Sequence, residues 1–299
     1  MRNFRRAPEA FFIALLLMVV HSCSLLLHSP AVVQDADAAF EAGEYEEALR
    51  LYGQYIDAQK SRNRDVNGAV LNRAGVSAFE LGQTQAAIDY LELARHTPEA
   101  DALTYATLAK AYRTVDNLSR EISNLERYLE AYSGHEEADV LRKRLFIALV
   151  ESRNWQQAAD LWLEFPEEKY KDEALMTGFL KVNRALENTG KASDLANMLL
   201  DLNPINTEAL DYLGRKHFDD AISRYNREMR AYEQNRTHRQ YAKLLEAFEI
   251  MNTDFRIALN YFLRLYEQDP RPEYASFLAN IYERFQDEER ARYFRSRAR

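Results

Sequence analysis

Small residues recur at helical spacing along most of this chain, and this pattern limits its fold more than any other feature of the sequence. The segment LNRAGVSAFELGQTQAAIDYLELA, residues 71–94, shows it most clearly. Small residues stand at Ala74, Gly75, Ala78, Ala87 and Ala94, with Gly82 in the middle of the segment. Residues three or four apart share one face of a helix, so the segment predicts two amphipathic helices joined by a tight turn at Gly82. The small side chains predict that the two helix axes approach to about 8–10 Å.

The same pair of helices is predicted several times along the chain. One small position of the second helix can be followed from pair to pair. It falls at Ala48, Ala87, Glu121, Ala158, Leu195, Ala258 and Ala291. The separations are 39, 34, 37, 37, 63 and 33 residues, and Glu121 and Leu195 depart from the small-residue rule. A single pair cannot bury its apolar face alone, so successive pairs are expected to stack into one continuous core.

These features resemble the tetratricopeptide repeat (TPR), a pair of helices of about 34 residues. The first helix of that repeat carries a leucine, a small residue and an aromatic residue, as at Leu108, Ala109 and Tyr112, and Asp269-Pro270 is typical of the close of a repeat. The resemblance implies an all-α fold: a right-handed solenoid of about seven helix pairs, whose first helices (helix A) line a concave surface that binds partners. The C-terminal region also resembles exported repeat proteins of Bacteroidota-type bacteria.

The 63-residue separation coincides with a long stretch of uninterrupted helical periodicity. No glycine or proline follows Gly214 in this stretch, which predicts one long helix over about 207–234. A sharp turn near Phe218-Asp219-Asp220 is the alternative. The expected organisation is an N-terminal TPR array over 35–203, a long spacer helix over 204–236, and a C-terminal TPR pair and cap over 237–299.

The first residues have the composition of an export signal. Arginines at positions 2, 5 and 6 precede a short apolar run over 11–20, which is too short to span a bilayer comfortably. The predicted signal peptide is 1–22, followed by a linker over 23–34. Cleavage before Cys23, the only cysteine, would leave a lipid-modified N-terminus as in bacterial lipoproteins, although His21 is unusual before such a cysteine. Cleavage after Ala31, releasing a soluble protein, and an uncleaved membrane anchor are the alternatives.

The sequence predicts no catalytic residue, no metal ligand and no cofactor. It contains no glycine-rich phosphate loop, nucleophile elbow or HExxH motif, and its lone cysteine excludes an internal disulfide. His217 is expected to be a packing residue that is hydrogen-bonded to a neighbour. Without residues 1–22 the chain has 36 basic and 46 acidic side chains, a formal charge of −10, which argues against binding to nucleic acid.

The predicted function is therefore that of a non-enzymatic scaffold or adaptor of the bacterial cell envelope, which binds protein or peptide partners along its helix A surface. The alternative is an accessory component, binding a glycan or a peptide, of an envelope uptake or secretion system. We expect export to the periplasm or outer membrane, with membrane attachment through a lipid on Cys23. The candidate partner-binding residues are Asn72, Phe79, Lys110, Arg113, Lys143, Arg184, Lys243 and Asn280.

Overall fold

The structure, a computed structural model, describes residues 30–298, and these residues form helices and turns without a strand. The chain divides into two compact units, with unit 1 ending at Ala148 and unit 2 beginning at Leu149. The boundary between the two units falls within helix α8 (Ala138–Glu151). The predicted signal peptide over 1–22 lies outside the described residues. The predicted linker over 23–34 is too long, because helix α2 already begins at Pro30.

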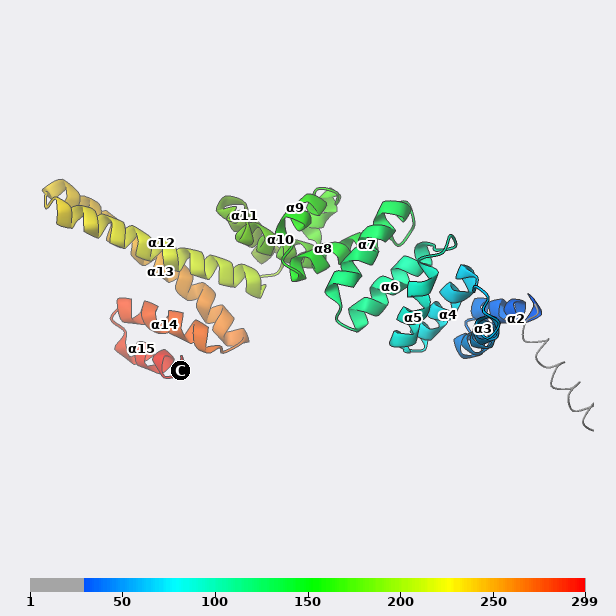
Figure 1. The fold of residues 1–299 in the computed structure, drawn as a ribbon. Coiled ribbons are helices and arrows are strands. Elements are labelled where there is room, and N and C mark those ends of the chain that lie inside the picture. Colours follow the sequence, from blue (N-terminus) through cyan, green and yellow to red (C-terminus); the bar gives the residue numbers. More distant parts are fainter. Residues whose placement is uncertain (1–29, 299) are drawn as a thin grey trace, which may run out of the picture. The chain divides into compact units, whose positions relative to one another are not determined.

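Unit 1 consists of three complete helix pairs and the first part of α8 (Figure 1). The pairs are α2 (Pro30–Glu41) with α3 (Tyr45–Lys60), α4 (Gly68–Glu80) with α5 (Thr84–Ala94), and α6 (Ala102–Thr114) with α7 (Leu118–Tyr132). Gly43 and Gly82 adopt φ angles of +75° and +73° in the turns of the first two pairs. The left-handed region favours glycine, so the predicted role of Gly82 in a tight turn is confirmed.

The small residues lie where the paired helices cross, as the sequence predicts. Ala74 in α4 and Ala87 in α5 are fully buried. A Cβ atom added to Gly75 would lie 2.5 Å from Leu91 Cγ, so only a residue without a side chain fits there. This close approach lets the stacked pairs form a continuous apolar core.

Unit 2 consists of the end of α8, the short helices α9 and η1, and three further pairs. Its elements are α9 (Trp155–Trp162), the 3-10 helix η1 (Glu167–Lys171), α10 (Glu173–Ala185), α11 (Thr189–Leu202), α12 (Thr207–Gln234), α13 (His238–Gln268), α14 (Pro272–Arg284) and α15 (Glu288–Arg295). Pairs form between α10 and α11, between α12 and α13, and between α14 and α15.

The long helix is confirmed: α12 runs without a break over Thr207–Gln234, and no turn interrupts it near Phe218. Its predicted role as a spacer is wrong, because α12 packs along α13 as the first helix of a pair. Phe218 contacts Phe255 of α13 with ring centroids 5.5 Å apart. Helix α13 is continuous over 31 residues, so the region over 237–299 contains the second helix of this long pair followed by one short pair, α14 and α15. Helices α12 and α13 thus form one helical hairpin, and the turn between them follows 28 residues of first helix, against 13 in α14.

The repeat register is uniform once the helix starts are known. The small position is the fourth residue of the second helix in the short pairs, as in Ala87 of α5, which begins at Thr84. In α11 this position is Ala192, which is fully buried, so the assignment of Leu195 was one turn too late. Glu121 does occupy the position in α7, and its side chain is buried against Arg144 of α8. The departure at Leu195 was therefore an error of register, and the departure at Glu121 is a true exception.

Candidate functional site

The helix A surface of unit 1 exposes two large apolar side chains at equivalent repeat positions. Leu103 in α6 is 40% exposed and Val140 in α8 is 70% exposed. Each lies 18 residues before the small position of its repeat, Glu121 and Ala158 respectively. Equivalent positions in adjacent repeats lie next to each other along a stack of helix pairs. The two side chains therefore form a repeating apolar feature that the fold itself leaves uncovered.

Basic side chains accompany these apolar residues. Lys110 and Arg113 of α6 are both exposed, and Lys143 of α8 is half-buried. Lys110 Nζ lies 3.4 Å from Glu137 Oε1, a surface ion pair of low strength. Three of the predicted partner-binding residues are thus on the two helices that carry Leu103 and Val140. We call Leu103, Lys110, Arg113, Val140 and Lys143 the α6–α8 surface.

Two other predicted binding residues of unit 1 have structural roles instead. Asn72 is buried, and its Nδ2 donates a hydrogen bond to Asp101 Oδ1 over 2.9 Å. Asp101 in turn caps α6 by accepting a hydrogen bond from the Thr104 backbone N–H. Asn72 therefore connects α4 to the next repeat, and the prediction of an exposed position is wrong. Phe79 is half-buried, because it packs against an apolar cluster formed by residues of α4, α5 and α6.

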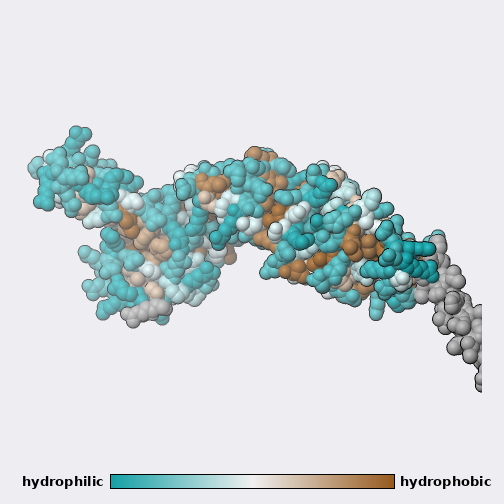
Figure 2. Space-filling view, in the orientation of Figure 1, coloured by the Kyte–Doolittle hydropathy of each residue, from teal (hydrophilic) through white to brown (hydrophobic). Residues whose placement is uncertain are grey.

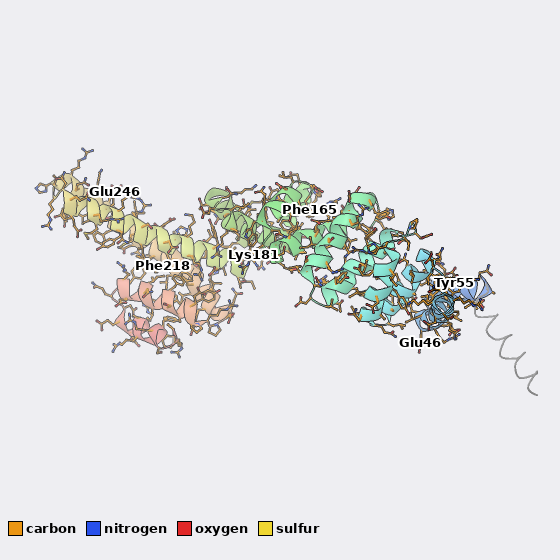
Figure 3. All side chains as sticks on the ribbon, in the orientation of Figure 1. Glu46, Tyr55, Phe165, Lys181, Phe218 and Glu246 are labelled. Carbon is orange, nitrogen blue, oxygen red and sulfur yellow. The ribbon has the colours of Figure 1, made fainter. Side chains whose placement is uncertain are left out.

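A polar groove between α2 and α4 was missed by sequence reasoning. It has a volume of about 440 Å³, and its lining includes Val33, Asp37, Tyr55, Val70 and Arg73 (Tyr55 is labelled in Figure 3). Arg73 NH1 lies 2.6 Å from Asp37 Oδ1. The only sequence signal for this pair was the helical spacing that places both residues on first helices of adjacent repeats.

A buried tyrosine fixes the carboxylate of this groove. Tyr52 of α3 is fully buried, and its hydroxyl donates a hydrogen bond to Asp37 Oδ1 over 2.5 Å. Burial raises the pKa of Tyr52 well above its ordinary value, and the hydrogen bond to Asp37 adds to this increase. The phenol therefore stays protonated and keeps donating, and it holds the Asp37 carboxylate in place beside Arg73, with both members of that ion pair 35% exposed in the groove.

In unit 2 the predicted residue Arg184 belongs to a ladder of ion pairs along successive first helices. Arg184 of α10 lies 3.4 Å from Glu208 and 3.3 Å from Asp211 of α12. Arg215 of α12 then joins Asp211, at 2.7 Å, to Glu273 of α14, at 2.6 Å. These ion pairs connect the three first helices α10, α12 and α14. The guanidinium of Arg184 is therefore already paired with two carboxylates of α12.

A second groove of about 420 Å³ lies beside this ladder. Its lining includes Arg184, Tyr212, Lys216 and Asp219. Burial raises the pKa of the Asp219 carboxyl, and the charge of Asp220 raises it further, while Arg215 acts in the opposite direction. The opposite charges in the groove are largely paired with one another, for example Lys216 with Asp220 at 2.6 Å. The groove therefore has no strong preference for one sign of charge.

The remaining predicted residues lie apart from both grooves. Lys243 is exposed on the first half of α13, beside a shallow pocket that Arg224 and Glu228 of α12 also line. Asn280 is exposed on α14. The predicted residues therefore do not form a single site, and only the α6–α8 surface brings several of them together. Cys23 lies outside the described residues.

Within residues 30–298, His, Cys, Asp and Glu side chains do not form a group of three or more suited to a metal ion. His217 Nδ1 lies 2.9 Å from Asp254 Oδ1, between α12 and α13, which agrees with the predicted packing role. In the same part of the chain no helix has both the length and the apolar character needed to cross a membrane.

Comparison with known proteins supports the fold. The sequence matches no protein-family model and no curated protein sequence. Among solved structures, one similar chain is YrrB, described as a TPR protein with an unusual peptide-binding site; the TM-score is 0.50 with 18% identity, over 69% of this chain and 98% of that one. The C-terminal part of a TPR repeat-containing protein from Cytophaga hutchinsonii gives a TM-score of 0.51 with 13% identity, over 89% of this chain and 93% of that one. A putative protein binding protein from Bacteroides ovatus gives 0.51 with 17% identity, over 75% and 100%.

The chain therefore has the fold of TPR proteins, an α-solenoid built from helix pairs. The predicted all-α fold class of about seven pairs with one long helix is confirmed. Several of the structurally similar proteins come from Bacteroidota. At these levels of identity the similarity shows the fold.

Proposed function

We propose that this protein is a non-enzymatic scaffold that binds a protein or peptide partner along the α6–α8 surface. The observation that carries the proposal is the exposure of Leu103 and Val140 at equivalent repeat positions. Covering these side chains with apolar groups of a partner would remove their area from water at about 25 cal/mol per Å². The repeat spacing favours an extended or helical segment that contacts adjacent repeats in turn.

The charges of the same surface indicate the chemistry of the partner. Lys110, Arg113 and Lys143 favour a segment that places carboxylates beside its apolar side chains, since complementary charges raise both association rate and specificity. The descriptions of YrrB as having a peptide-binding site and of the Bacteroides ovatus protein as protein binding support this kind of partner.

We further propose that the protein acts in the bacterial cell envelope, in the periplasm or at the outer membrane. The support is the N-terminal sequence: basic residues, a short apolar run over 11–20, and the only cysteine of the chain three residues after it. Acylation of Cys23 would attach the scaffold to a membrane. Mass spectrometry of the mature N-terminus distinguishes this from release after Ala31, which would leave an unmodified Val32 terminus.

A photocrosslinking amino acid at Val140 tests the binding surface in the full chain. We expect it to capture a protein partner that the same probe at Leu93 does not capture. Leu93 is a matched control, because it is 50% exposed but lies on α5, a second helix. With the purified partner, the Leu103→Ser/Val140→Ser variant is expected to bind at least about tenfold more weakly, and Leu93→Ser to bind as wild type. Equal binding by both variants, or capture of no protein at Val140, would refute the proposal.

A further inference from the structure

The pair α12–α13 is about twice as long as the pairs around it. Helices α12 and α13 have 28 and 31 residues, whereas α14, which packs on them, has 13. Figure 1 shows the consequence: α14 and α15 lie beside the half of α13 that follows its middle, and the other end of the hairpin extends past them. We call residues 222–251 the projecting hairpin.

One apolar stripe runs along α13 through both halves of the helix. Leu259 and Tyr266 lie on the half that α14 and α15 cover, with Tyr266 and Phe294 of α15 in ring contact at 5.3 Å. Tyr241 and Phe248 stand 18 residues before them. Eighteen residues make about five full helical turns, so these residues lie on the same face of α13. The stripe that binds α14 and α15 therefore continues into the projecting hairpin.

The part of α13 that α14 covers ends near Arg284, the last residue of α14. Arg284 lies over the rings of Tyr225, at 5.7 Å, and Phe255, at 5.8 Å. Further along, Tyr241 and Leu245 are each 48% exposed. Figure 3 shows the two regions, with Phe218 labelled beside α14 and Glu246 labelled towards the free end. Tyr241 and Phe248 each touch one ring of α12, Tyr232 at 5.8 Å and Tyr225 at 5.4 Å between ring centroids, and among the described residues the exposed remainder of the stripe carries no helix equivalent to α14.

The free end of the hairpin is basic, although the whole chain has a formal charge of −8. Residues 227–243, which include the turn of the hairpin, hold five arginines and lysines against two glutamates, and the whole projecting hairpin, 222–251, holds six against four. The cations are Arg227, Arg230, Arg236, Arg239 and Lys243. The exposed face of this end in Figure 2 is correspondingly hydrophilic. A partner that approaches this end gains from carrying negative charge, because complementary potentials steer association and exclude wrong partners.

We propose that the projecting hairpin is a second docking surface, which binds an acidic amphipathic helix of a partner protein. The apolar side of that helix packs on Tyr241, Leu245 and Phe248, in continuation of the packing that α14 provides. Its carboxylates face the cations of the free end, such as Arg236 and Arg239. This surface is separate from the α6–α8 surface, and the inference holds whether or not that surface binds a peptide.

The test uses the full chain and two designed helical peptides with a fluorescent label. Both peptides carry leucines at heptad spacing, one with glutamates on its flanks and the other with lysines. Fluorescence anisotropy is expected to show binding of the acidic peptide at least about tenfold tighter than of the basic one. The variants Tyr241→Ser/Leu245→Ser and Arg236→Glu/Arg239→Glu should each weaken the acidic peptide by at least about tenfold. Leu163→Ser, at a 76% exposed site elsewhere in unit 2, should leave the affinity unchanged.

The outcomes distinguish a partner helix from two other occupants of the hairpin, a lipid surface and a second copy of the chain. Equal affinity for the two peptides, no binding of either, or full binding by the hairpin variants would overturn it. Flotation with vesicles of phosphatidylglycerol and phosphatidylcholine that depends on Arg236 and Arg239, without peptide binding, would assign the free end to a lipid surface. A dimer in analytical ultracentrifugation that Tyr241→Ser/Leu245→Ser dissociates would make a second copy the occupant. Either result would also overturn the proposal, while thermal unfolding by circular dichroism checks that every variant is folded.

Discussion

Replacing Arg144 by methionine should destabilise unit 1 more than most single substitutions. Glu121 of α7 occupies the crossing position that is alanine in most other repeats, and its side chain is only 2% exposed. Both of its carboxylate oxygens accept from Arg144 of α8: Oε1 from Nε at 2.5 Å and Oε2 from the guanidinium at 2.9 Å. The pair satisfies a charge that the helix crossing would otherwise not accommodate.

The expected loss in the free energy of unfolding depends on which charged group each substitution leaves without its partner. Arg144→Met keeps most of the apolar stem but leaves the buried Glu121 carboxylate without its countercharge, which costs about 3–5 kcal/mol. Glu121→Ala restores the usual small residue and leaves an arginine whose side chain is 16% exposed and can reach water, so we expect about 1 kcal/mol. The double variant should lie within about 1 kcal/mol of the wild type, since replacing a buried ion pair by apolar groups is often neutral.

Urea unfolding of the four proteins, followed by circular dichroism, measures this cycle. Circular dichroism is needed because both tryptophans, Trp155 and Trp162, belong to unit 2, and their fluorescence does not report on unit 1. With a slope of about 2 kcal/mol per M, Arg144→Met should lower the midpoint by about 1.5–2.5 M. A loss of less than about 1 kcal/mol, or a double variant as unstable as Arg144→Met, would show that Arg144 does not act by neutralising Glu121.

Two further predictions follow from single contacts. Gly75→Ala should cost about 1–3 kcal/mol in the same unfolding assay, because the added Cβ would overlap Leu91 Cγ at 2.5 Å; an unchanged midpoint would contradict the close crossing. Hydrogen bonds from Asn206 and Asn203 lower the pKa of Glu173, so this group stabilises the folded state above its unfolded pKa and the stabilisation is lost as pH falls through the lower folded value. Asn206→Ala should therefore raise the pKa of Glu173 in an NMR titration and weaken this pH dependence, and an unmoved pKa would exclude the hydrogen bond as its cause.

The candidate binding residues show where sequence reasoning is limited. Asn72 and Lys110 both fall on first helices, and helical spacing alone does not distinguish them. Asn72 is buried because Asp101, at the start of the next repeat, approaches it, and that approach depends on how repeats stack. The exposure of Val140 has the same origin, since an apolar residue in a helix is expected in the core until its neighbours are placed.

The sequence by itself determined the repeating helix pairs, the turn at Gly82 and the continuous helix α12, because each depends on local periodicity and backbone preference. Only the tertiary structure decided that α12 is half of a long hairpin rather than a spacer. An amphipathic stripe shows that a helix packs on something, and the partner is set by contacts between distant residues, such as Phe218 with Phe255. For the same reason, only the structure shows that the stripe on α13 continues past the end of α14.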